Sequence, residues 1–285
     1  MDVVSRPYRE KIVSFGESGG LIGVLSVPAG ERAQAPHVVL LNSGLIHHVG
    51  ASRLHVGFAR AFAAAGITTL RFDLSGIGDS ERQSEALSLQ ESVQRDIAGA
   101  LAFLSTECGA TRLVLAGVCS GAYDAFQVAL GDPRVSGAVL IDIPGPFQTW
   151  RHIAHHLWAR VFRLSSWRNP MEKVVLYGRA LRLLSQLERG ESEPAFVQGV
   201  RPRVSHRTME AALDTLLARN VALYFVFTAG LEGNYNHRSQ FRHRFPRAAA
   251  HPALSVDFLP ESDHTFSARS ARTQVTGLVR DWILR

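Results

Sequence analysis

The chain has little sulfur and contains no long apolar run. Its 285 residues include only two cysteines, Cys108 and Cys119, too few for the disulfide framework of a small secreted domain. The first ten residues lack the apolar stretch of a secretory signal, and no segment approaches the length of a membrane-spanning helix. These absences predict a cytoplasmic protein with neither a disulfide framework nor a membrane span.

Acidic residues are scarce in one part of the chain. Residues 151–190 carry eight Lys or Arg and only two acidic side chains, which accounts for the whole formal net charge of +6. Further arginines follow a later apolar run: Arg238, Arg242, Arg244 and Arg247. No nucleic-acid-binding motif accompanies them, so we expect no nucleic-acid partner. An anionic partner such as an acyl or peptidyl carrier protein fits these charges, and a solvated basic face is the alternative.

Short apolar runs alternate with helical segments along most of the chain. Its length suits one α/β domain with an insertion. Strands are predicted at 21–28, 38–41, 67–72, from 113, and at 137–141, 222–227 and 254–259, and helices at 59–65, 89–104 and 122–130. This alternation is typical of a mostly parallel central sheet with helices on both faces.

One stretch interrupts that alternation. It is rich in Arg, Leu, Trp and His at helical spacing and is far longer than an ordinary connection. We therefore predict a helical cap at 144–217 over a core formed by 1–143 and 218–285. Three histidines of the cap stand at helical spacing: His152, His155 and His156. No cysteine or carboxylate completes a site with them, so no metal is predicted.

The most informative motif surrounds Cys119, where a strand, a sharp turn and a helix follow one another. Such a turn strains its central residue, so the residues two before and two after it must be small. Gly117 and Gly121 meet this condition for Cys119, whereas a turn centred on Ser120 would place the branched Val118 in a flanking position. The spacing predicts a nucleophile elbow centred on the cysteine. An ordinary buried cysteine beside a plain turn is the alternative.

Four segments in this order resemble the α/β-hydrolase superfamily: Leu41–Leu45, Asp73–Ser80, Gly117–Gly121 and Ser262–Phe266. The resemblance implies an α/β-hydrolase fold in which His264, late in the chain, is the catalytic base. It also implies an oxyanion hole built from the backbone N–H groups of Leu45 and Ser120. Two residues depart from the family pattern, because Ser43 replaces the histidine of the usual His-Gly pair and Cys119 replaces the usual serine.

Two branches of that superfamily are also similar to this chain. Residues 42–50 and 71–80 resemble cysteine-elbow hydrolases found with bacterial exosortase systems. The hydrolase-fold Dieckmann cyclases have an elbow cysteine, a late histidine and an aspartate after the strand that follows the elbow, and Asp142 corresponds to that aspartate. The customary acid of the superfamily follows a later strand, where this chain has Glu232. We prefer Asp142 as the partner of His264 and keep Glu232 as the alternative.

These residues predict cysteine-dependent acyl transfer. Cys119 attacks an ester or a carrier-bound thioester and holds the acyl group, with His264 as base and Asp142 orienting the histidine. Water, an amine or a carbon nucleophile can accept that group. A hydrolase, an acyltransferase and a Dieckmann-type cyclase that releases its product from a carrier protein therefore stay open. A hydrolase-fold protein that only binds a ligand is the non-catalytic alternative, and no cofactor is predicted.

Overall fold

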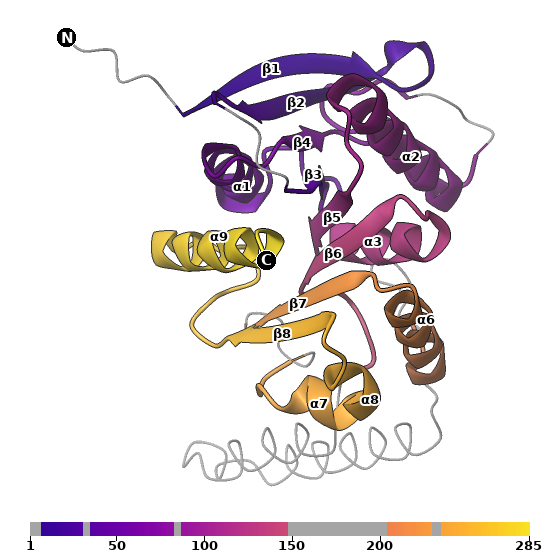
Figure 1. The fold of residues 1–285 in the computed structure, drawn as a ribbon, viewed down its shortest axis with the longest axis vertical. Helices are drawn as coiled ribbons and strands as arrows, with labels where there is room; N and C mark the ends of the chain where they lie inside the picture. The colour runs from indigo at the N-terminus through magenta and orange to yellow at the C-terminus, as the bar shows by residue number, and fades with distance from the viewer. Residues whose placement is uncertain (1–6, 31–34, 83–86, 148–203, 230–234) are drawn as a thin grey trace, which may run out of the picture.

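A central sheet organises the computed structural model, which describes residues 7–30, 35–82, 87–147, 204–229 and 235–285 (Figure 1). The strands are β1 (Tyr8–Phe15), β2 (Leu21–Pro28), β3 (His37–Leu41), β4 (Thr69–Phe72), β5 (Leu113–Val118), β6 (Val135–Ile141), β7 (Ala222–Thr228) and β8 (Leu254–Leu259). Their order is β1-β2-β4-β3-β5-β6-β7-β8. From β4 through β8 the neighbouring strands are parallel, and β1 and β2 add an antiparallel edge. The predicted mostly parallel sheet is confirmed.

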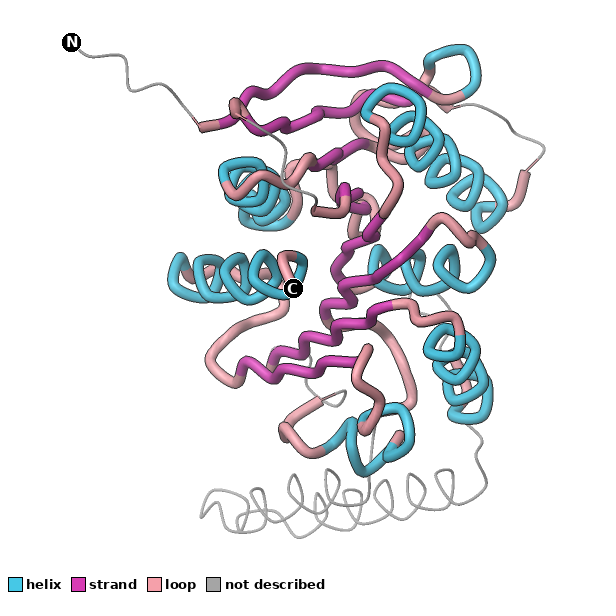
Figure 2. The backbone as a smooth tube through the Cα atoms, viewed as in Figure 1, coloured by secondary structure: helices cyan, strands magenta, loops and turns pink. Residues whose placement is uncertain are grey.

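Helices cover both faces of the sheet. They are α1 (Leu54–Ala64), α2 (Leu89–Cys108), α3 (Ser120–Gly131), α6 (His206–Ala218), α7 (Gln240–Arg244), α8 (Pro246–Ala249) and α9 (Arg269–Ile283), with the short 3-10 helices η1 (Glu17–Gly19) and η2 (Ala51–Arg53). Helices α1 and α9 lie on one face, and α2, α3 and α6 lie on the other (Figures 1 and 2).

The central strands are apolar on both sides because each face packs under helices. In β5, Leu113 and Leu115 belong to the core under α2, α3 and α6, whereas Val114 and Ala116 belong to the core under α1 and α9. All six residues of β5 are buried. A strand held in this way fixes the position of the turn that follows it, which begins at Cys119.

The predicted cap lies largely outside the described residues. Residues 148–203 are among those not described, so the helical cap and its boundaries stay predictions, as does any role for His152, His155 and His156. At the C-terminal end of the predicted range, α6 packs with the core: Met209, Leu213 and Leu216 join the cluster under α3. Among the helices that the structure describes, none has both the length and the apolar character needed to cross a bilayer.

Candidate active site

Cys119 occupies the turn between β5 and α3. Its backbone has φ 56° and ψ −114°, a combination that costs energy for any residue with a side chain. The following residue, Ser120, is already the first residue of α3. Cys119 is therefore the residue at the apex of the elbow, and its side chain is half-buried.

The two glycines that flank the turn are required by close backbone contacts. A Cβ atom on Gly117 would lie 2.3 Å from the carbonyl carbon of Gly121. A Cβ atom on Gly121 would lie 2.5 Å from the carbonyl oxygen of Asn42, at the end of β3. Any side chain at either position would push the helix away from the sheet, so the elbow geometry depends on both glycines.

His264 brings the late loop to the elbow. It follows β8, and its Nδ1 atom lies 2.9 Å from Oδ2 of Asp142, while the side chain also hydrogen-bonds Cys119. These bonds to Asp142 and Cys119 favour the imidazolium and raise the pKa of His264 to about 10. Because Nδ1 faces the carboxylate, Nε2 is the ring nitrogen that remains to contact the Cys119 thiol.

Asp142 is held rigidly at the end of β6. Its side chain is buried, and its backbone has a positive φ of 48°. The carboxylate accepts hydrogen bonds from the backbone N–H of Thr228 at 2.7 Å and from the Thr228 hydroxyl at 2.6 Å. Thr228 ends the neighbouring strand β7. Asp142 is thus fixed between two strands with Oδ2 turned to His264.

The loop that carries His264 is shaped by the residue before it. Asp263 accepts hydrogen bonds from the backbone N–H groups and the hydroxyls of Thr265 and Ser267. These bonds hold the pKa of the Asp263 carboxyl well below its usual range. Asp263 therefore closes the loop on itself, and the carboxylate that contacts His264 belongs to Asp142.

The predicted oxyanion loop is tied to the elbow and to the next loop of the sheet. The Gly44 N–H donates to the Ser120 hydroxyl at 2.6 Å. The Asn42 side chain donates to the Ile46 carbonyl at 2.8 Å and to Asp73 at 3.1 Å. Leu45 lies between these anchored residues, and the residue is 86% exposed. The role of the Leu45 and Ser120 backbone N–H groups toward an oxyanion stays a prediction.

The structure brings Cys119, His264 and Asp142 together, and it adds Thr228, which sequence reasoning missed as a partner of the acid. Its position at the end of a strand was visible, but the pairing of β6 with β7 was needed to see the contact. Glu232 lies outside the described residues, so its role as an alternative acid stays a prediction.

The arginines after β7 divide into two kinds. Arg244 is half-buried, and its Nε atom donates to the Pro146 carbonyl at 3.0 Å. Arg238, Arg242 and Arg247 are exposed. Arg244 therefore anchors the chain after β6, and Arg247 pairs with Glu210 at 3.5 Å.

The chain matches the model of one protein family. The family described as "Serine aminopeptidase, S33" matches residues 33–248, which is more than half of the chain. No curated protein matches the chain.

Solved structures of several hydrolases have a similar fold. The dienelactone hydrolase of Anabaena variabilis aligns with a TM-score of 0.57 at 14% identity, covering 98% of each chain. The esterase domain of a Rhodothermus marinus protein aligns with a TM-score of 0.57 at 19% identity, covering 97% of this chain and 99% of that one. An α-β serine hydrolase homologue from Coxiella burnetii gives 0.56 at 13% identity, covering 96% of each. The predicted α/β-hydrolase fold is confirmed, whereas the likeness to the cysteine-elbow branches stays a prediction.

Proposed function

The chain belongs to the serine aminopeptidase S33 family, and on that premise we propose that it is an acyl-transfer enzyme in which Cys119 replaces the serine nucleophile. The observation that carries the proposal is the chain of contacts from the elbow residue Cys119 through His264 to the buried Asp142. A nucleophile, a base and an orienting acid in this order are what acyl transfer requires.

The adjacent hydroxyl is a poorer candidate for the nucleophile. Ser120 is buried in the first turn of α3, and its oxygen already accepts the Gly44 N–H. A nucleophile needs access to the substrate and a base within hydrogen-bond reach. Cys119 meets both conditions, because it is half-buried and hydrogen-bonds His264.

The reaction follows from these contacts. His264 is already an imidazolium below its raised pKa, so Cys119 reacts as the thiolate paired with it. As Sγ of Cys119 bonds to the carbonyl carbon of an ester or thioester, the carbonyl oxygen becomes an oxyanion. The N–H groups of Leu45 and Ser120 are the proposed donors to that oxyanion. The carbon–oxygen or carbon–sulfur bond of the substrate then breaks, and the leaving alcohol or thiol takes the proton from His264. Cys119 now carries the acyl group as a thioester.

The second half of the reaction transfers the acyl group to an acceptor. His264, neutral after that proton transfer, takes a proton from water, an amine or a carbon acid, and the acceptor displaces Sγ, which leaves as the thiolate. Asp142 stabilises the His264 imidazolium before the first half of the reaction and after the second. The exposed arginines Arg238 and Arg242 support an anionic carrier protein as the source of a thioester substrate.

Intact-mass measurement after mixing the chain with aryl esters and with acyl-pantetheine thioesters tests the proposal. We expect one acyl adduct on the native chain and none on Cys119→Ala. Cys108→Ala is the matched control, because it removes the other cysteine, and it should keep the adduct. An adduct that persists in Cys119→Ala but disappears in Ser120→Ala would identify a serine nucleophile. No adduct and no turnover with any donor would favour a binding protein.

The Cys119→Ser variant separates transfer from hydrolysis. Serine leaves an oxygen ester, which amines and carbon nucleophiles attack more slowly than a thioester. If transfer is the purpose of the site, turnover of thioesters in Cys119→Ser falls at least about 100-fold. If the variant hydrolyses aryl esters as well as the native chain does, water is the natural acceptor and the transferase part of the proposal is wrong.

A further inference from the structure

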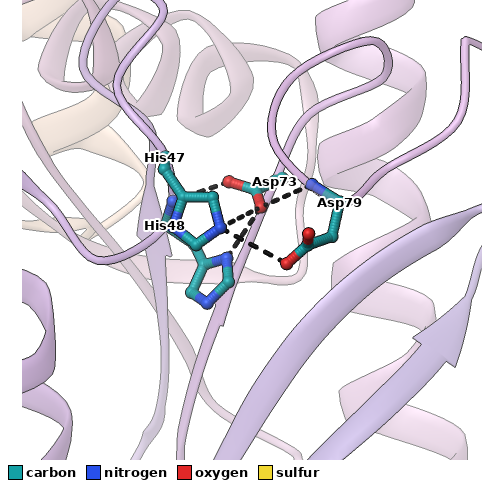
Figure 3. A group of neighbouring side chains, drawn as sticks. All are labelled: His47, His48, Asp73 and Asp79. Carbon is teal, nitrogen blue, oxygen red and sulfur yellow. Dashed lines mark hydrogen bonds and ion pairs between the residues drawn. The ribbon is translucent and has the colours of Figure 1, made fainter.

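A second group of titratable side chains lies beyond the ends of β3 and β4. His47, His48, Asp73 and Asp79 each offer one metal-ligand atom, and these four atoms lie within 4.8 Å of one another. Figure 3 shows the two histidines beside Asp73 and the Asp79 carboxylate turned toward His47. Two of the residues precede η2 and the other two follow β4. The acyl-transfer mechanism uses none of them.

Asp73 forms the buried floor of this group. Its Oδ1 atom accepts the backbone N–H of His48 at 2.6 Å and the side-chain amide of Asn42 at 3.1 Å. Its Oδ2 atom accepts the backbone N–H of Asp79 at 3.2 Å. The carboxylate is thus fixed in place by the two loops that it joins. A buried, pre-oriented carboxylate is a suitable ligand for a cation because little ordering remains to be done on binding.

Two distances have the spacing of ligands around one ion. Zinc binds imidazole nitrogen and carboxylate oxygen at about 2.0–2.2 Å, so two ligands of a tetrahedral ion lie about 3.3 Å apart. His47 Nε2 is 3.3 Å from Oδ2 of Asp73 and 3.3 Å from Oδ2 of Asp79. His48 Nδ1 is only 2.7 Å from Oδ2 of Asp73, a hydrogen-bond length that is too short for two ligands of the same ion.

Gly78 brings the loop after β4 close against the Asp73 carboxylate. Gly78 has φ +52°, and a Cβ atom there would lie 2.2 Å from Asp73 Oδ2 and 2.6 Å from Cδ2 of His47. Only a glycine therefore allows the loop to approach Asp73 and His47 this closely. The His47 and Asp79 side chains are 40% and 64% exposed, so an ion can enter from solvent.

We propose that His47 Nε2, Asp73 Oδ2 and Asp79 Oδ2 bind a divalent transition-metal ion of the zinc type, with His48 as a positioning residue for Asp73. Two carboxylates and a neutral imidazole match the charge and the nitrogen–oxygen preference of such an ion. Three protein ligands at a solvent-facing site leave a position for water. The ion joins the oxyanion loop to the loop after β4, and so holds the segment that carries Leu45.

Binding has one structural consequence at His47. Coordination of a metal through Nε2 of His47 requires that its ring proton sit on Nδ1. Without the ion, Nδ1 accepts the Val49 N–H at 3.4 Å. That long contact has to open when the ion binds. Since it is weak, the loss is small compared with the gain of a metal bond.

The test titrates the untagged full chain, stripped with EDTA, with Co²⁺ and then with Zn²⁺. We expect one equivalent of Co²⁺ to give the visible spectrum of a low-coordinate site, Zn²⁺ to displace it, and the melting temperature to rise on binding. His47→Ala and Asp79→Asn should abolish both signals. His48→Ala should weaken binding about 10- to 100-fold, the range found when a residue that orients a ligand is removed.

Two control variants locate the site. His237→Ala removes an exposed histidine elsewhere on the surface and should bind as the native chain does. Cys119→Ser removes the elbow thiol and should also keep the spectrum, which separates this site from the catalytic one. The proposal is wrong if the spectrum survives His47→Ala, if it disappears in Cys119→Ser, or if the stripped chain gives no spectrum. None of these metal-binding measurements depends on acyl-transfer activity.

Discussion

The Ser120 hydroxyl accepts the backbone N–H of Gly44 at 2.6 Å. This bond joins the residue after the elbow cysteine to the residue before Leu45, across the ends of the adjacent strands β5 and β3. One N–H of the loop is thereby occupied, and the loop is held at a fixed distance from Cys119. Ser120 is in this way a positioning residue for the proposed oxyanion donors, through its side chain as well as its backbone.

Removing that hydroxyl should slow catalysis without preventing it. Ser120→Ala loses a hydrogen bond of about 1 kcal/mol, so we expect kcat to fall about 5- to 10-fold. KM should change little, because the oxyanion exists only in the transition state and the intermediate. Steady-state kinetics on an aryl ester measure both constants.

A matched hydroxyl deletion checks that the effect belongs to the site. Ser136→Ala removes a side-chain bond to the Leu113 carbonyl at the other end of the sheet and should leave kcat unchanged. A rise in KM at constant kcat in Ser120→Ala would show that the bond supports substrate binding instead. Complete loss of the acyl adduct would assign the nucleophile to Ser120.

The identity of the acid can be decided by comparing Asp142→Asn with Glu232→Gln. Asparagine at 142 cannot stabilise the imidazolium, so we expect kcat to fall roughly 10³- to 10⁴-fold, as in other triads that lose the charge of their acid. Glu232→Gln should change kcat by less than about 3-fold, within the range of context effects. The opposite pattern would make Glu232 the acid and Asp142 a structural residue.

Stability should depend on pH through His264. Its folded pKa of about 10 exceeds the ordinary value of 6.5, so the folded chain holds a proton that the unfolded chain releases. This contribution to the free energy of unfolding is complete below pH 6.5 and is lost as pH rises toward 10. Because Cys119 contributes to the shift, the cleaner measurement is urea unfolding of Cys119→Ala between pH 6 and 10.

The comparison chain for that measurement is the double variant, which carries both Cys119→Ala and His264→Gln. The Asp142 bond remains in Cys119→Ala, so we expect its stability to decline over this range more steeply than that of the double variant. Parallel stability curves for the two chains would mean that Asp142 does not raise the pKa of His264.

The sheet was largely predictable because its central strands are apolar on both faces. Runs such as β3 and β7 contain hardly a polar residue and stand out from their surroundings. The edge strand β1 was missed because most of its residues are exposed or half-buried, and its polar side chains conceal the alternation. The C-terminal helix α9 was also missed, since only four of its residues are buried: Ala271, Val275, Val279 and Ile283.

The elbow was predictable because its tight turn excludes side chains at two positions that lie within five consecutive residues. Gly117 and Gly121 are close to Cys119 in the chain, so spacing alone revealed the turn. The contact of Thr228 with Asp142 and the group around Asp73 were not predictable, because each joins residues from different strand ends or loops. Such contacts depend on strand order and loop closure, which local patterns do not encode.

The last prediction concerns the glycine that brings α3 against β3. Gly121→Ala places a methyl group 2.5 Å from the Asn42 carbonyl oxygen, so the helix or the strand must shift, and we expect a loss of about 1–3 kcal/mol in the free energy of unfolding. Gly57→Ala is the matched control, because position 57 lies exposed within α1 with open space around it. Alanine there should raise the free energy of unfolding by about 0.5–1 kcal/mol. Urea unfolding measures both changes.

Equal effects at the two positions would show that the close approach at the elbow is not required for folding. If Gly121→Ala folds, acyl-adduct formation should still slow, because Cys119 is displaced from His264.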